Sequence, residues 1–331
     1  MQPRSNTSTP ASRKSATLDL RGLLLPFTTP FKEKEDLDVP KLRANLRRWN
    51  ATGIRGYVVL GSTGERVNLD EREYTAVIDV AREEVPPDQT FIVGAGQESR
   101  RGSINEIKRA AIAGADAVLV ITPHFYRAAI TQQALIDHYT AVAEASPVPV
   151  ILYSMPDLTG IKIEPETAAQ LSTHANIIGI KDSSADVSAL GETIRLVAAD
   201  FAVLTGNGTV FYDALCAGAC GAILAVGCVA TAQCLEIYRL AQAGDGEGAA
   251  RLQSKLTPLA LAVTKRYGIG GLKTAMDLIG FAGGVPRAPL QPVSAAARQE
   301  IAELLEQSAA ELPTAPSGST GETNFAGTVK S

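Results

Sequence analysis

The chain has 331 residues, of which 45% are hydrophobic and 20% are charged, and its formal net charge at pH 7 is −4. This length and apolar content predict one or two domains with a large core, and the absence of a basic stripe argues against a nucleic-acid partner. No apolar run approaches the roughly 18 residues of a transmembrane helix, so no membrane partner is predicted.

The N-terminal stretch Met1–Ala16 is rich in Ser, Thr, Arg and Lys, has no acidic residue and lacks an apolar core. It does not match a secretory signal. It is compatible with a mitochondrial transit peptide and equally with a disordered bacterial tail. We favour the tail and a cytoplasmic location, with a mitochondrial location as the alternative for a eukaryotic source. Residues 313–331 contain Ser, Thr, Gly and Pro throughout, which predicts a second disordered tail.

Between these tails, eight short apolar runs follow one another and predict strands. They are Gly22–Phe27, Gly56–Leu60, Phe91–Ala95, Ala117–Ile121, Pro149–Tyr153, Ile177–Lys181, Ala202–Gly206 and Gly221–Val226. The segments between the runs have the periodicity of single helices, and we interpret Ser103–Glu106 as the capping box that opens one of them.

Strands that alternate with single helices predict parallel pairing through right-handed crossovers. Eight such units match a (β/α)8 TIM barrel. The competing fold is an open doubly wound sheet. Such a sheet usually carries a Gly-rich phosphate loop after its first strand, and Pro26–Pro30 is not one.

The chain beyond the eighth run is too long for one closing helix. Helical segments are predicted over Ala249–Tyr267, Gly271–Phe281 and Ser294–Leu312. The predicted organisation is therefore a disordered tail over 1–18, a catalytic barrel over 19–242, a C-terminal helical domain over 243–312 and a second tail over 313–331.

The cysteines form no CxxC pair, and the histidines do not complete a zinc-type spacing. These residues are Cys216, Cys220, Cys228, Cys234, His124, His138 and His174. We predict no metal and no organic cofactor, and we interpret the cysteines as reduced thiols in a reducing compartment.

In a barrel, functional side chains collect where strands end. Lys181 ends the sixth run, Tyr153 ends the fifth, and the turn Gly61–Glu65 follows the second. A lysine held among apolar walls loses its charge more easily than one in water, and a neutral amine can attack a ketone. The two glycines of the turn allow its amides and hydroxyls to bind a small anion such as a carboxylate. Each feature is ordinary by itself, but together they favour an active site.

Three stretches then resemble motifs of the dihydrodipicolinate synthase/N-acetylneuraminate lyase family: Gly61–Glu65, Tyr153–Pro156 and Gly179–Asp182. The resemblance covers roughly Leu20 to Leu305. It implies a barrel with C-terminal helices, a homotetramer or homodimer, and a lysine that forms a Schiff base with pyruvate or another 2-oxo acid.

The resemblance also implies roles for individual residues. Lys181 is the Schiff-base lysine, Tyr153 the proton-relay phenol and Ser62 a member of that relay. Four further residues would bind substrate. Thr63 would hold the carboxylate, and Ile223 would line the pyruvate pocket. The other two are Ser183 and Gly206.

Departures from the family pattern bear on the substrate. Dihydrodipicolinate synthases usually carry an arginine where this chain has Leu158, and sialic acid lyases carry acids where it has Gly208 and Thr209. The tyrosine that family members lend to a neighbouring subunit aligns with Phe125, although Tyr126 is adjacent. Another set of stretches looks most similar to the 4-hydroxy-2-oxoglutarate aldolase branch: Thr122–Arg127, His138–Tyr139, Ser146–Pro149 and Ile177–Asp182.

We therefore predict a class I aldolase that cleaves 4-hydroxy-2-oxoglutarate to pyruvate and glyoxylate. The alternatives are 4-hydroxy-tetrahydrodipicolinate synthesis from pyruvate and aspartate semialdehyde, cleavage of a 2-keto-3-deoxy sugar acid, and a non-enzymatic 2-oxo acid sensor. Retention of both Lys181 and Tyr153 argues against the sensor, because binding alone needs neither. The candidate partners for the distal carboxylate of 4-hydroxy-2-oxoglutarate are the Ser62 and Ser183 hydroxyls and, just beyond the fourth run, Arg127.

Overall fold

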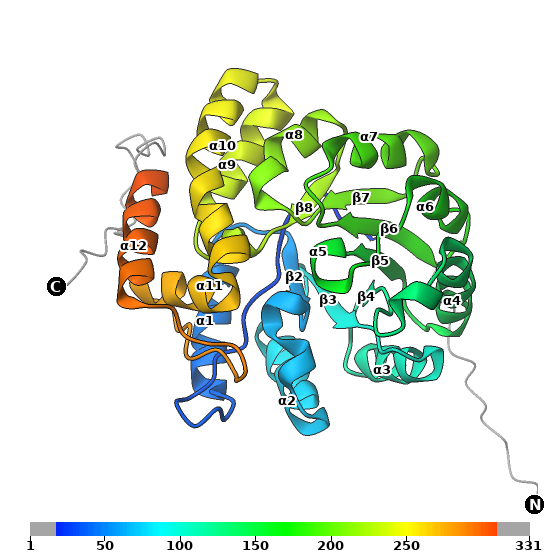
Figure 1. Ribbon diagram of the computed structural model, residues 1–331, viewed down its shortest axis with the longest axis horizontal. Helices are drawn as coiled ribbons and strands as arrows, with labels where there is room; N and C mark the ends of the chain where they lie inside the picture. Colours follow the sequence, from blue (N-terminus) through cyan, green and yellow to red (C-terminus); the bar gives the residue numbers. More distant parts are fainter. Residues whose placement is uncertain (1–17, 310–331) are drawn as a thin grey trace, which may run out of the picture.

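Eight parallel strands pair in chain order and close into a barrel in the computed structural model, which describes residues 18–309 (Figure 1). The strands are β1 (Gly22–Leu25), β2 (Gly56–Val59), β3 (Thr90–Ala95), β4 (Ala117–Ile121), β5 (Val150–Ser154), β6 (Ile177–Asp182), β7 (Ala202–Thr205) and β8 (Gly221–Ile223). The predicted TIM barrel is confirmed, and the open sheet is excluded because β8 pairs with β1. Both predicted tails lie outside the described residues, apart from residue 18.

The seam of the barrel depends on a close approach of two glycines. Gly22 and Gly221 are register partners, and a Cβ on Gly221 would overlap the carbonyl oxygen of Gly22. A side chain at residue 221 would therefore hold β8 away from β1.

The strand β8 is shorter than the predicted run Gly221–Val226. It has three residues, because the 3-10 turn η5 (Ala225–Cys228) begins soon after it.

Helices surround the barrel (Figure 1). They are α1 (Val39–Asn50), α2 (Glu71–Glu84), α3 (Arg100–Ile112), α4 (Gln132–Ala145), the short α5 (Pro156–Thr159), α6 (Pro165–Leu171), α7 (Val187–Leu196), α8 (Phe211–Cys216) and α9 (Thr231–Ala243). Helix α2 begins at a capping box, in which Asp70 and Glu73 each accept a bond from the other's backbone N–H.

The capping box predicted at Ser103 is wrong. Helix α3 begins at Arg100, and its N-cap is Ser99, whose Oγ accepts a 3.0 Å bond from Gly102 N. Ser103 lies inside the first turn, where its Oγ donates to Gln97 O. Glu106 is used elsewhere, since its Oε2 accepts from Gly96 N at the end of β3.

The apolar core has two parts. Side chains inside the barrel form one cluster, which includes Leu24, Ile151 and Ile223. The larger cluster fills the layer between the strands and the helices and continues into the C-terminal helices. Trp49 of α1 is fully buried there and stacks on Phe281 at 4.9 Å between ring centroids.

The last helices of the described chain pack beside α9 and α1 (Figure 1). They are α10 (Gly246–Leu261), which continues through a π-turn over Ala262–Arg266, then α11 (Gly268–Leu278) and α12 (Ala295–Ala309). Gln253 of α10 reaches the loop after β7, where its Nε2 donates a 2.9 Å bond to Gly208 O. Three helices were predicted here; the division into two domains at residue 242 stays a prediction.

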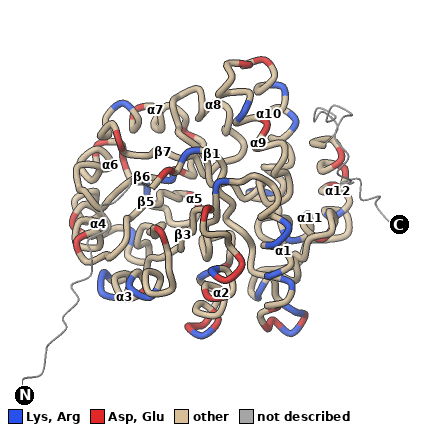
Figure 2. Tube along the Cα trace, turned by 180° about the vertical axis from the view of Figure 1, so that it is seen from behind, with Lys and Arg blue, Asp and Glu red and all other residues tan. Residues whose placement is uncertain are grey.

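Across residues 18–309, no helix combines the length and the apolar character needed to cross a membrane. Charges of both signs are mixed over the surface (Figure 2). Basic residues gather on α3, where Arg100, Arg101, Lys108 and Arg109 lie.

Candidate active site

Lys181 lies near the end of β6, in register with Tyr153 on β5 and Leu204 on β7. Both partners belong to the apolar cluster inside the barrel, and Lys181 itself is only 4% exposed. Its Nζ lies 4.4 Å from the centroid of the Tyr153 ring. Among residues 18–309 no carboxylate pairs with this amine, so the amine faces an aromatic ring and apolar walls.

Tyr153 and Ser62 are joined directly. The Tyr153 OH and the Ser62 Oγ are 2.9 Å apart, and either oxygen can be the donor. Tyr153 is buried and Ser62 is half-buried. The two residues come from different parts of the barrel mouth, β5 and the loop after β2. A phenol whose ring lies beside the amine and whose OH is bonded to a hydroxyl has the arrangement of a proton relay.

The turn that carries Ser62 is folded tightly. Ser62–Gly64 form the 3-10 turn η1, and Glu65 N donates a 3.1 Å bond back to Ser62 O. The Thr29 Oγ1 donates a 2.7 Å bond to Gly64 O from the opposite side. Thr63 is buried in this turn, next to Ser62.

Gly206 and Ser183 complete the surroundings of the amine. A Cβ added to Gly206 would overlap Ser183 Oγ and would lie 2.5 Å from Lys181 Cε. Gly206 therefore provides the space that these two side chains occupy. Ile223 is fully buried on β8, inside the barrel. The structure thus brings Lys181, Tyr153 and Ser62 together and sets Gly206 and Ser183 against them; Thr63 and Ile223 lie on adjoining elements.

Asp182, the residue after Lys181, is buried as well. Burial raises the pKa of its carboxyl group, although the Asp182 carboxylate also accepts a 2.7 Å bond from Ser184 N. Successive residues of a strand face opposite sides of the sheet. Asp182 therefore faces away from Lys181 and shapes the β6–α7 loop.

The rim of the barrel mouth carries exposed apolar side chains. Phe125 and Tyr126 are 73% and 72% exposed and meet edge to face, with ring centroids 5.1 Å apart. The Glu98 carboxylate holds their loop by accepting from the backbone N–H groups of His124 and Phe125. Leu158, on α5, is 60% exposed.

Arg127 lies along the end of α5. A Cβ added to Gly160 would come within 2.9 Å of Arg127 Cδ and 3.0 Å of its Nη1. Arg127 is exposed to solvent.

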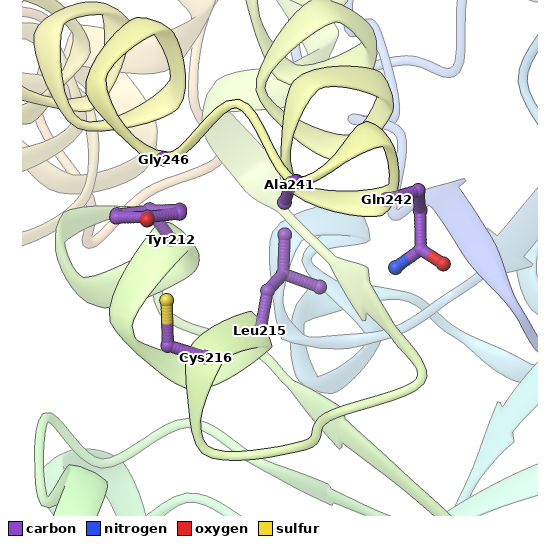
Figure 3. A pocket seen from close by; sticks show the side chains of 7 residues that line it. Tyr212, Leu215, Cys216, Ala241, Gln242 and Gly246 are labelled. Carbon is purple, nitrogen blue, oxygen red and sulfur yellow. The ribbon is translucent and has the colours of Figure 1, made fainter.

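A half-open pocket lies away from this site. It has a volume of about 120 Å³ and is lined mainly by Tyr212, Leu215 and Cys216 of α8, together with residues around the end of α9 (Figure 3). It shares no residue with the cluster around Lys181. In the described chain, no group of three or more His, Cys, Asp and Glu side chains is placed to hold a metal ion.

Sequence reasoning did not single out Lys273, a fully buried lysine of α11 that pairs with Glu65. One signal was available: a glutamate that ends a Gly-rich turn at a barrel mouth needs a cation once it is buried. The sequence does not say which of 31 Lys and Arg residues supplies it.

The model of the dihydrodipicolinate synthetase family matches residues 19–308. The chain belongs to this family. A curated relative, the 4-hydroxy-tetrahydrodipicolinate synthase of Methanothrix thermoacetophila, is 34% identical over 83% of this chain and 92% of its own length. Another, from Methanopyrus kandleri, is 33% identical over 90% of this chain and 98% of its own length.

Solved structures agree with this family membership. Dihydrodipicolinate synthase DapA-2 from Bacillus anthracis is 28% identical and superposes with a TM-score of 0.85, covering 90% of this chain and all of that one. YagE, a prophage protein of the family from Escherichia coli K12 solved in complex with pyruvate, is 28% identical, with a TM-score of 0.81 and coverage of 87% and 98%.

The predicted family and its enzymatic character are thereby confirmed: the chain is a lyase-type enzyme of the dihydrodipicolinate synthetase family. The prediction about the reaction is confirmed only at this level. The names of the relatives agree with the alternative, 4-hydroxy-tetrahydrodipicolinate synthesis, and do not confirm the main prediction of 4-hydroxy-2-oxoglutarate cleavage.

Proposed function

We propose that this enzyme catalyses a reversible aldol-type reaction of pyruvate through a Schiff base on Lys181. The observation that carries the proposal is the cluster of amine, phenol and hydroxyl: Lys181 Nζ lies 4.4 Å from the Tyr153 ring, and Tyr153 OH lies 2.9 Å from Ser62 Oγ. A buried amine beside a proton relay is the arrangement that imine formation requires.

The steps follow from these groups. The neutral amine of Lys181 attacks the ketone carbon of pyruvate, and the carbinolamine loses water after a proton reaches its oxygen through Tyr153. The resulting iminium draws electrons from C3, whose proton passes to the Tyr153 oxygen, and C3 becomes the nucleophilic carbon of an enamine. That carbon forms a bond to an aldehyde carbon, and the new alkoxide takes a proton from Tyr153. Water then hydrolyses the imine, and the reverse sequence cleaves the same bond.

Four neighbouring residues have roles in binding pyruvate in this proposal. Thr63 and the amides of its turn would bind the carboxylate. Gly206 leaves room beside the amine, and Ile223 would contact the methyl group. Ser183, which lies against Gly206, would face the second substrate.

For the second substrate, the relatives favour aspartate semialdehyde. The curated proteins with 31–34% identity over most of this chain are named 4-hydroxy-tetrahydrodipicolinate synthases. The first candidate reaction is therefore condensation of pyruvate with this aldehyde.

A specific residue favours a second candidate, cleavage of 4-hydroxy-2-oxoglutarate. The side chain at position 158 of α5 is an exposed leucine and cannot pair with the carboxylate of aspartate semialdehyde. A cation nearby is Arg127, which lies against Gly160 at the end of the same helix. It would serve the distal carboxylate of the shorter 4-hydroxy-2-oxo acid.

Borohydride trapping tests the shared chemistry. We expect pyruvate with borohydride to leave one reduced adduct per chain, located by peptide mass mapping at Lys181. Lys181→Arg should abolish it, because a guanidinium does not become a neutral nucleophile. An adduct on another lysine, such as the buried Lys273, would contradict the proposal.

Parallel assays decide between the two second substrates. The wild-type enzyme is given pyruvate with aspartate semialdehyde in one assay and 4-hydroxy-2-oxoglutarate in the other, and kcat/KM is compared. A matched variant, Leu158→Arg, should raise the condensation relative to the cleavage if the leucine sets the preference. Equal ratios in wild type and variant would show that position 158 does not choose the substrate.

A further inference from the structure

The turn that carries Ser62 and Thr63 ends on a buried carboxylate that is held by a C-terminal helix. Glu65 Oε1 lies 2.5 Å from Lys273 Nζ, and both side chains are 1% exposed. Lys273 belongs to α11, more than two hundred residues further along the chain. Oε1 accepts no hydrogen bond of regular geometry from the described residues, so the ammonium group is its partner.

Lys273 is itself fixed by the C-terminal segment. Its Nζ donates a 2.8 Å bond to Val285 O and lies 4.4 Å from the centroid of the Phe31 ring. Phe31 and Val285 are joined by an antiparallel bridge. Burial lowers the pKa of Lys273, and the charge of Glu65 opposes that shift. The Lys273 ammonium is therefore held in place by contacts with Glu65, Phe31 and Val285.

The second oxygen of Glu65 is held as well. Oε2 accepts a 3.0 Å bond from Arg287 N and a 3.3 Å bond from Asn68 Nδ2. The Arg287 guanidinium makes two bonds, of 2.5 and 2.6 Å, to the carboxylate of Glu73 on α2. Both oxygens of Glu65 are thus held by residues of the segment 273–287.

The backbone at Glu65 needs this anchorage. Its φ and ψ are 56° and 33°, in the left-handed region that residues with a side chain seldom adopt. Glu65 N donates to Ser62 O, so the conformation at Glu65 sets where the Ser62 carbonyl and the Thr63 peptide lie. Surrounding contacts have to hold such a conformation in place.

We propose that Glu65 and Lys273 are a positioning pair, which orients the Ser62–Thr63 turn for the carboxylate of the 2-oxo acid and for the bond from Ser62 to Tyr153. The inference rests on the proposed function for the ligand that the turn binds. In this proposal the C-terminal helices contribute to the active site indirectly: Lys273 of α11 holds the turn that binds the substrate.

The test replaces both charges together. In Glu65→Gln/Lys273→Met the shapes are kept and neither partner is left as an unpaired buried charge, so we expect a cooperative unfolding transition. Each single variant leaves one buried charge unpaired and should unfold at a lower temperature than the double variant.

The readout is the rate of borohydride-trapped adduct formation against pyruvate concentration. We expect the double variant to need about 10- to 100-fold more pyruvate for half-saturation, because small misplacements of binding groups cost up to about 10²-fold. Amide exchange in the peptide that contains Ser62 and Thr63 should also be faster without pyruvate. These two readouts report how well the turn is positioned. The melting temperature reports stability, so the two effects are measured separately.

The control is an ion pair of the outer helices, Arg43 with Glu84, whose Nη1 and Oε1 are 2.9 Å apart. Arg43→Met/Glu84→Gln should leave the pyruvate dependence and the exchange of the turn unchanged. A Glu65→Gln/Lys273→Met variant that matches wild type in both readouts overturns the inference.

If the double variant does not fold, Glu65→Asp carries the test, because it keeps both charges but withdraws the carboxylate by one methylene. We expect about tenfold weaker half-saturation from that change, and wild-type behaviour overturns the inference. If the wild-type enzyme forms no adduct, the proposed function fails, and the amide-exchange comparison alone decides on the positioning pair.

Discussion

Tyr153 occupies the central place in the site, because it contacts the Lys181 amine through its ring and the Ser62 hydroxyl through its oxygen. These two contacts have separate consequences. The ring limits where the amine lies, and the hydroxyl is the only part that can move a proton. A substitution that removes the oxygen alone therefore separates packing from proton transfer.

Tyr153→Phe is expected to lower kcat by about 10²–10⁴-fold, the range for loss of an acid/base group. The ring stays in place, so half-saturation by pyruvate should change little. Steady-state kinetics with either candidate second substrate measures both quantities. Turnover equal to wild type would make Tyr153 a packing residue, and Ser62→Ala, which removes its partner, should show a smaller loss of the same kind.

Gly206→Ala tests the space beside the amine. The added Cβ would overlap Ser183 Oγ and crowd Lys181 Cε, so we expect Lys181 to be displaced and adduct formation to be lost. Crowding of this kind also costs about 1–3 kcal/mol of unfolding free energy.

The matched control is Gly191→Ala on α7, where the nearest atom to the new Cβ is 3.9 Å away. That change should stabilise the protein by about 0.5–1 kcal/mol, because alanine is the better helix former. Adduct formation should be unchanged in it. Normal trapping by Gly206→Ala would show that the pocket has more room than the structure gives it.

At the scale of elements, α4 carries a buried titratable group. His138 is 7% exposed, and burial lowers its pKa to about 4, with Arg100 adding to the shift and Glu98 opposing it. The unfolded chain binds a proton at this residue near pH 6.5. Between those two values the unfolded state holds more protons than the folded state, so stability falls as the pH falls.

We expect this group to lower the unfolding free energy by about 3 kcal/mol between pH 7 and pH 4. His138→Phe keeps a ring of similar size and should flatten that part of the pH profile. Urea unfolding at several pH values measures the slope. Parallel profiles for wild type and variant would show that other groups cause the acid sensitivity.

Elements also show what the sequence could predict. Apolar runs identified all eight strands. A barrel strand is buried on both faces, so it is a continuous apolar run that can be recognised without knowing which strands pair with it. The start of α3 was misplaced, because Ser99 and Ser103 both precede suitable residues and only the tertiary bond from Gly96 N to Glu106 decides between them. The predicted site residues stand on strand ends, which the topology brings together. Lys273 was missed, since its partner is chosen by packing between distant segments.

At the scale of the whole molecule, the C-terminal helices share the core of the barrel. Leu256, Met276 and Ile301 are fully buried in the same cluster as Leu42 of α1. Trp49 loses the nearer of its two stacked aromatic rings, those of Phe281 and Phe27, if Phe281 is removed. The predicted homotetramer or homodimer and the predicted cytoplasmic location stay predictions.

We expect a chain that ends at residue 243 to fail to fold as a stable barrel. Its core would expose the apolar side chains that α10 to α12 cover, and Glu65 would lose Lys273. Far-UV circular dichroism and thermal unfolding of the purified fragment provide the measurement. A fragment that melts cooperatively near the wild-type temperature would instead support two independent domains divided at residue 242.

The long reach from Glu65 to Lys273 also bears on when a newly made chain becomes competent to react. Lys181, Tyr153 and Ser62 have all left the ribosome before α11 is synthesised. The turn that carries Ser62 and Thr63 gains its contacts to Lys273 and Arg287 only with residues 273–287. If Glu65 and Lys273 act as proposed, the site is completed only when this segment is in place, which ties the reactivity of Lys181 to the synthesis of α11.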